Sequence, residues 1–285
     1  MERVTSLNEA LGHDPDDRLL IISATNLGQA HGANVAVYES IRTGLATTGS
    51  LMVPCPWSRD AASRYRGEDI GVQLTLNAEL DRYRWGPVTM SPSLLDGDGG
   101  FPRTAEDLWD HADLDEVRRE CRSQIERAIL WGFDVTHLDA HLGALQRRPE
   151  FFDVFIDLAC EFGLPICLPA VGDERAIGFP ARELAREENI LAADHVIDAK
   201  GRPTRAVIEA AIFDLQPGVT VLSVSPATDA PEIRGLDPDW SGRVEDYLVT
   251  SHDAGIRNLV DRSGATLIGY RELRTAQRAA GGCRD

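Results

Sequence analysis

The segment Phe133-Asp134-Val135-Thr136-His137-Leu138-Asp139-Ala140-His141-Leu142-Gly143 decides the fold of this chain. Its first six residues predict a short β-strand, and a helix is predicted from Pro149, because proline suits the first helical turn. A strand that leads into a helix belongs to an α/β layer, where ligands bind at the carboxyl ends of strands. The alternation of His137, Asp139 and His141 predicts three side chains on one face. They could bind a metal, move protons or bind a sugar, or form only a structural hydrogen-bond network.

Apolar runs and amphipathic segments alternate along the rest of the chain. Strands are predicted at residues 18–24, 50–54, 70–76, 164–168, 195–198, 219–226 and 266–270. Helices are predicted at residues 34–43, 60–65, 113–132, 149–163, 181–188, 205–215 and 243–262. This order predicts a single α/β domain, a (β/α) barrel-like fold with about seven parallel strands. We expect a lead-in at residues 1–17, the barrel domain at 18–274 and a flexible tail at 275–285.

Composition excludes several classes of partner. The net charge of −17 makes nucleic acid and anionic lipid unfavourable partners. No apolar run approaches the ~20 residues that span a bilayer, so no membrane association is expected. The first residues show no apolar signal-peptide core, which predicts a cytoplasmic protein. Lys200 is the single lysine, which disfavours Schiff-base chemistry.

The cysteines support a prediction about disulfides. The five cysteines include no CxxC pair, which predicts buried free thiols in a reducing compartment in place of disulfides or zinc ligands.

Residues 77–104 form a long loop rich in Gly, Pro, Asp and aromatic residues. A loop of this length predicts a lid or a substrate wall, with Tyr83 and Trp85 stacking on sugar rings. The alternative is an insertion whose aromatic side chains only pack against the barrel.

Several segments resemble the signature segments of the YdjC-like carbohydrate deacetylases, the group that includes chitooligosaccharide and hopanoid-pathway deacetylases. The segments are Leu20-Ile21-Ile22-Ser23-Ala24-Thr25-Asn26-Leu27-Gly28, Gly71-Val72-Gln73-Leu74-Thr75-Leu76, Thr136-His137-Leu138-Asp139-Ala140-His141, Val224-Ser225-Pro226 and Leu267-Ile268-Gly269-Tyr270. The resemblance covers residues 18–274. It implies metal-dependent removal of an acetyl group from a sugar, with zinc or magnesium held by one Asp and two His. A second Asp would act as general base, and a further His would assist the leaving group.

This chain departs from that pattern at four positions. Thr25 and Asn26 stand where the family has paired aspartates, Gln73 where it has a metal-binding histidine, and Ser225 where it has histidine before proline. The resemblance leaves His141 at a metal-ligand position. An Asn/Gln/His set is a poor zinc site, because charged ligands supply much of the affinity. We therefore expect no metal cofactor.

Three hypotheses follow for function. In the first, the chain acts on a carbohydrate or glycosylated metabolite by metal-independent elimination, isomerisation or hydrolysis, with Asp139 and His141 as catalytic acid and base. In the second it is a non-catalytic carbohydrate binder, and in the third a residual metal-dependent deacetylase. Substrate-binding roles are predicted for Thr25, Asn26, His31, Gln73, Glu79, Tyr83, Trp85, His137 and Ser225, with Asp81 as a further loop candidate. A homodimer is a possible assembly.

Overall fold

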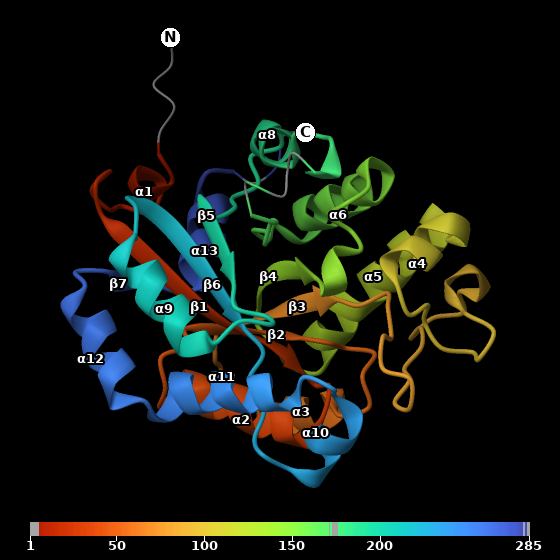
Figure 1. The fold of residues 1–285 in the computed structure, drawn as a ribbon. Helices are drawn as coiled ribbons and strands as arrows, with labels where there is room; N and C mark the ends of the chain where they lie inside the picture. The colour runs from red at the N-terminus through yellow and green to blue at the C-terminus, as the bar shows by residue number, and fades with distance from the viewer. Residues whose placement is uncertain (1–5, 171, 173–175, 282, 284–285) are drawn as a thin grey trace.

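A parallel β-sheet curled into a half-barrel forms the centre of the computed structural model, which describes residues 6–170, 172, 176–281 and 283 (Figure 1). Its strands are β1 Arg18–Leu27, β2 Thr48–Leu51, β3 Ile70–Leu74, β4 Val135–Ala140, β5 His195–Asp198, β6 Gly218–Val224 and β7 Thr266–Leu267. The strand order is β4-β3-β2-β1-β6-β5, and β7 pairs with β1. The predicted α/β fold with parallel strands is confirmed.

Strand β1 is the central element because it pairs with β2, β6 and β7. Its residues Leu19, Leu20, Ile21 and Ile22 are almost completely buried, as expected for a parallel strand covered on both faces. Strands β4 and β5 stand at the two ends of the order, so the sheet is a half-barrel. The strand predicted at 164–168 is reduced to one bridge, between Leu138 and Ile166.

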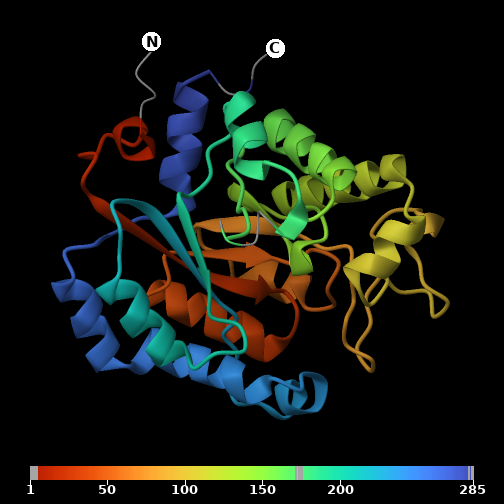
Figure 2. The same ribbon diagram turned by 45° about the horizontal axis from the view of Figure 1, so that its top comes forward.

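Helices cover both faces of the sheet, and the predicted ones lie close to their expected positions, whereas the helices at residues 7–10, 105–111, 231–236 and 270–279 were not predicted. The longer ones are α2 His31–Arg42, α5 Leu114–Leu130, α6 Pro149–Phe162, α9 Thr204–Phe213, α11 Trp240–His252, α12 Ala254–Arg262 and α13 Tyr270–Ala279. The shorter ones are α1 Leu7–Ala10, α3 Ser58–Arg64, α4 Ala105–His111, α8 Ala181–Glu187, α10 Pro231–Leu236, η1 Pro92–Leu94 and η2 His141–Gly143. Figure 2 shows α5 beside α6, and α9 beside α11 and α12. No helix in the described part of the chain is long and apolar enough to cross a membrane.

The carboxyl-terminal third differs from the sequence-based expectation. The single helix predicted at 243–262 is two helices, because Asp253 ends α11 and caps α12 by accepting hydrogen bonds from Gly255 N and Ile256 N. The flexible tail predicted at 275–285 contains the end of α13, and Cys283 forms a disulfide with Cys160. The prediction of free thiols was therefore wrong for this pair, which is separated by 123 residues. The other three cysteines are free.

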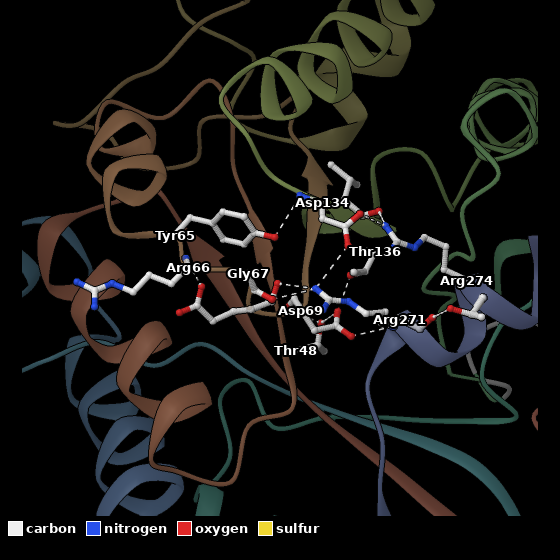
Figure 3. A network of polar contacts seen from close by, with 12 residues as sticks. Thr48, Tyr65, Arg66, Gly67, Asp69, Asp134, Thr136, Arg271 and Arg274 are labelled. Carbon is white, nitrogen blue, oxygen red and sulfur yellow. Dashed lines mark hydrogen bonds and ion pairs between the residues drawn. The ribbon is translucent and has the colours of Figure 1, made fainter.

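A polar network joins α13 to the sheet at the amino ends of β2, β3 and β4 (Figure 3). Asp69, just before β3, accepts hydrogen bonds from Thr48 Oγ1 at 2.8 Å, from Arg271 N at 2.7 Å and from Thr136 Oγ1. Burial raises the pKa of Asp69 in spite of these hydrogen bonds. The network fixes the start of α13, whose first residue, Tyr270, is almost completely buried.

Candidate active site

A cavity of about 960 Å³ lies at the carboxyl ends of the strands. Its lining includes seven of the residues singled out in the sequence: Thr25, Asn26, Gln73, Glu79, Asp139, His141 and Ser225. They come from β1, β3, β4, η2, the loop after β3 and the residue that follows β6, so they are far apart in sequence. The structure therefore brings the expected strand-end residues to one cavity, as parallel strands in such folds do.

The clearest interaction in the cavity is a carboxylate–imidazole pair. His141 Nε2 lies 2.9 Å from Glu79 Oε2. His141 is 3% exposed, and it follows β4 in the short helix η2, where Leu142 has a φ of 53°. Burial acts to raise the pKa of Glu79, but the charge and hydrogen bond of His141 outweigh it and lower that pKa to about 2. Glu79 is therefore an ionised partner for the imidazole.

A second carboxyl group, that of Asp139, lies beside Gln73. The two residues are register partners on β4 and β3, and Gln73 Nε2 donates a hydrogen bond to Asp139 Oδ2 at 3.2 Å. Ala140 N donates to Asp139 Oδ1 at 2.8 Å. Burial raises the pKa of Asp139 in spite of these bonds, so this acid holds a proton more firmly than an exposed aspartate. Gln73 Oε1 is buried and accepts no hydrogen bond from the described residues.

Two hydroxyl groups line the β1–β6 side of the cavity. Thr25 Oγ1 donates to Val224 O at 3.1 Å and lies 2.8 Å from Ser225 Oγ. Asn26, the next residue, has a φ of 66°, in the left-handed region that asparagine tolerates better than most residues. This side of the cavity therefore presents neutral hydroxyl and amide groups.

Four predicted residues lie outside that cavity. His31 and Tyr83, with Trp57, line a separate, largely apolar groove of about 590 Å³. Tyr83 Oη donates to the carbonyl oxygen of Gln29, which itself lines the cavity. Trp85 is 4% exposed and donates from Nε1 to Asn77 O at 2.8 Å, so its ring packs the loop and is not open for sugar stacking.

His137 is the fourth of these residues, and its position corrects the expectation of three side chains on one open face. Its ring stacks on Tyr270 with centroids 3.9 Å apart, and the residue is 1% exposed. Burial lowers the pKa of His137 to about 3, so the ring is neutral. Tyr270, the first residue of α13 and 133 residues later in the chain than His137 (270 − 137), covers this ring. The loop residue Asp81 is also removed from the cavity, and its carboxylate pairs with Arg103 at 3.0 Å.

Several charged lining residues escaped the sequence analysis. Arg243 and Asp246 belong to the first two turns of α11, and Asp246 Oδ2 accepts a hydrogen bond from Ser225 N at 2.7 Å. Burial raises the pKa of Asp246 to about 6. Asp198, the last residue of β5, and Lys200, which follows that strand, line the same cavity. Position was the available signal for Asp198 and Lys200, which lie at the carboxyl end of a predicted strand, whereas nothing in the local sequence indicated Arg243 and Asp246.

The donor groups do not fit a zinc site. In the described ranges, no three His, Cys, Asp or Glu side chains are grouped so that they could hold a metal ion. Asn26 and Gln73 offer neutral amides, and the Nε2 lone pair or proton of His141 is engaged by Glu79. Structural and catalytic zinc sites use at least three His, Cys or carboxylate ligands.

The fold and cavity together define an α/β half-barrel protein with a polar ligand site at the carboxyl ends of its strands. The family model described as YdjC-like protein matches residues 19–261, and the chain belongs to this family.

Similar proteins carry deacetylase names. A carbohydrate deacetylase of Thermus thermophilus is 36% identical over 263 residues, which are 90% of this chain and 94% of that protein. A chitooligosaccharide deacetylase of Yersinia pestis is 26% identical over 53% of this chain and 59% of its own length. The crystal structure of an Enterococcus faecalis protein, provisionally assigned to cellobiose-phosphate cleavage, superposes with a TM-score of 0.79 at 20% identity. It covers 90% of this chain and 99% of the other, and shows the fold alone.

Proposed function

We propose that this protein acts on a carbohydrate or a glycosylated small molecule, with His141 and Asp139 as the groups that exchange protons with it. The observation that carries the proposal is the His141–Glu79 pair, 2.9 Å apart in a cavity at the strand ends. The Glu79 carboxylate fixes the orientation of the ring, and an imidazole held in this way can accept and return a proton without a metal. Membership of a carbohydrate deacetylase family supports a carbohydrate as the ligand.

Asp139 complements the imidazole of His141 because the environment of Asp139 differs from that of Glu79. Burial raises its pKa, whereas Glu79, the other carboxyl group on this side of the cavity, is held ionised. The two carboxyl groups therefore have different roles: Asp139 favours its protonated form, and Glu79 stays ionised beside His141. A buried Asp139 suits donation of a proton to a leaving oxygen, and His141 suits removal of a proton from a hydroxyl or an activated carbon. Elimination, isomerisation and hydrolysis all use such a pair.

Neutral hydrogen-bonding groups support a hydroxylated ligand. The free Oε1 of Gln73 accepts from a hydroxyl, and the Thr25–Ser225 pair offers further hydrogen bonds. The departures of Thr25, Asn26, Gln73 and Ser225 from the family pattern support chemistry without zinc. The expected homodimer and cytoplasmic location stay predictions.

The test is a carbohydrate panel with and without a metal chelator. Purified protein is screened by calorimetry for binding and by mass spectrometry for conversion, using acetylated and unacetylated oligosaccharides. Conversion that persists in chelator and falls in His141→Ala supports the proposal. Binding without conversion favours the non-catalytic binder. Acetate release that requires zinc or magnesium favours a residual deacetylase and overturns the metal-independent mechanism.

A further inference from the structure

The guanidinium of Arg243 is built into the cavity wall. Arg243 is 4% exposed and lies in the first turn of α11. Its Nε donates to Ser225 O at 3.0 Å, and its Nη1 donates to Gln29 Oε1 at 2.6 Å and to Asp237 Oδ2 at 3.0 Å. Its carbonyl oxygen accepts from Ala227 N at 3.0 Å. These contacts hold the side chain in one orientation beside the end of β6.

One nitrogen of this group has no partner. Arg243 Nη2 is buried and makes no hydrogen bond with the described residues. A buried N–H of a charged group that stays unpaired is destabilising by several times the usual net value of a hydrogen bond. Arg243 lines the cavity, so a small shift of the groups that cover Nη2 would let a molecule held there supply the missing oxygen acceptor.

The surrounding charges determine which kind of ligand oxygen can accept a hydrogen bond from Nη2. Asp237 already neutralises Arg243 at 3.0 Å. Asp246 is also near Arg243, whose charge acts to lower the pKa of Asp246 against the effect of burial. With Asp139 counted as protonated, carboxylates still outnumber cationic side chains in the cavity lining by six to four. An anionic ligand would meet net repulsion here, whereas a hydroxyl or an amide carbonyl would accept from Nη2 without adding charge.

We propose that Arg243 is a ligand-binding residue that donates from Nη2 to a neutral oxygen of the carbohydrate, and that this site discriminates against anionic sugars. The inference rests on the proposed carbohydrate ligand and adds to it a donor and a charge preference. The Nε of Arg243 also donates to the carbonyl oxygen of Ser225, so the same side chain shapes the β6 side of the cavity.

The test compares matched neutral and anionic sugars. Binding of cellobiose, N,N′-diacetylchitobiose, N-acetylglucosamine and N-acetylglucosamine 6-phosphate is measured by calorimetry on the wild type and on Arg243→Lys. Lysine keeps the charge but cannot supply three separate nitrogens in one plane. We expect the wild type to bind a neutral sugar at least about tenfold more tightly than the phosphate, and Arg243→Lys to bind the neutral sugar about 10–100-fold more weakly.

Two further variants separate this role from folding. Arg274→Lys changes another buried arginine, on α13 outside the cavity lining, and should keep the wild-type dissociation constant. Asp237→Asn keeps an acceptor for Nη1 and removes the counter-charge of Arg243. The ratio of neutral-sugar affinity to phosphate affinity should therefore fall about tenfold. This measurement remains available even if Arg243→Lys fails to fold.

The failures are distinguishable. A wild type that binds no sugar of the panel overturns the carbohydrate proposal and this inference with it. Unchanged neutral-sugar affinity in Arg243→Lys overturns the role of Arg243 alone. A wild type that prefers the phosphate, or an Asp237→Asn variant with unchanged preference, overturns the charge selectivity.

Discussion

His141 Nε2 and Glu79 Oε2 lie 2.9 Å apart, although 62 residues separate them in the chain. His141 follows β4, and Glu79 belongs to the loop after β3. The loop is held by its own buried contacts, including the hydrogen bond from Trp85 to Asn77. The carboxylate is thus presented to the imidazole by a packed wall, and a fixed carboxylate–imidazole pair is a recurrent arrangement for proton transfer.

Replacing Glu79 by glutamine should change how stability depends on pH. The pKa of Glu79 is lowered from 4.5 to about 2, so its ionised form contributes stability above pH 4.5, and that contribution is lost as the pH falls towards 2. Glu79→Gln should therefore be less stable than the wild type near pH 6, by on the order of 1–2 kcal/mol since the side chain is partly exposed, and the difference should vanish on acidification. Urea unfolding between pH 2.5 and 6 measures it.

Asp81→Asn serves as the control for Glu79→Gln, because Asp81 lies in the same loop and its side chain is 82% exposed. Its stability difference from the wild type should stay small at every pH. A Glu79→Gln curve parallel to that of the wild type would show that the ion pair does not form in solution.

Asp139→Asn and His141→Ala should each lower turnover by about 10²–10⁴-fold, the usual loss when a general acid or base is removed. The expected defect is in kcat, with the fold retained and with no dependence on added metal. His111→Ala, at an exposed position of α4, should keep full activity. Circular dichroism checks the fold, and the assay uses whichever panel sugar the wild type converts. Full turnover in both site variants would refute the assignment of these catalytic groups.

Sequence reasoning found what depends on local pattern and missed what depends on tertiary contacts. Apolar runs such as that in β1 predict buried parallel strands, and the ends of those strands predict the cavity. The sequence around His137 contains no sign that Tyr270 stacks on it. The same holds for Arg243, whose helix was expected but whose contact with Ser225 depends on how α11 packs. The Cys160–Cys283 pairing is equally non-local, since odd cysteine counts alone cannot identify a pair.

Asp134→Asn should destabilise the network at the amino ends of the strands. Arg274 is only 10% exposed in its side chain and donates from Nη2 to Asp134 Oδ2 at 2.9 Å (Figure 3). Its hydrogen bond, its charge and the nearby Arg271 lower the pKa of Asp134. Loss of the charge leaves a nearly buried guanidinium without its counter-ion, and we expect about 1.5–3 kcal/mol lower stability in urea unfolding at pH 7.

Asp157→Asn is the matched control for Asp134→Asn. Asp157 pairs with Arg118 at 2.6 Å, but the arginine side chain is 36% exposed there, so the loss should be below about 1 kcal/mol. Equal losses in the two variants would mean that burial of Arg274 adds nothing to the pair.

Cys283→Ser should lower stability only under oxidising conditions. The Cys160–Cys283 bond joins the end of α6 to the residues after α13 and closes a loop of 123 residues, so it restricts the unfolded chain. We expect the variant to lose about 2–4 kcal/mol in urea without reductant and to match the wild type in reductant. Thiol titration of unfolded wild-type protein without reductant should find three free thiols. Five free thiols in protein purified and kept under air would contradict the pairing.

The double variant Asn26→Asp, Gln73→His should gain a metal site. The two substitutions place a carboxylate and an imidazole in the cavity that holds His141, which gives three ligands of the types that zinc prefers. Glu79 competes for His141 Nε2, so we expect tighter binding still when Glu79→Gln is added. Zinc affinity, measured by competition with a chromogenic chelator, should rise at least about 100-fold over the wild type, since changes to groups around a metal already alter affinity 10–100-fold. The single variants should gain less, because neither completes a set of three. Wild-type protein that binds one equivalent of zinc as tightly as the double variant would show that the present side chains suffice for a metal, and would return the chemistry to a metal-dependent deacetylase.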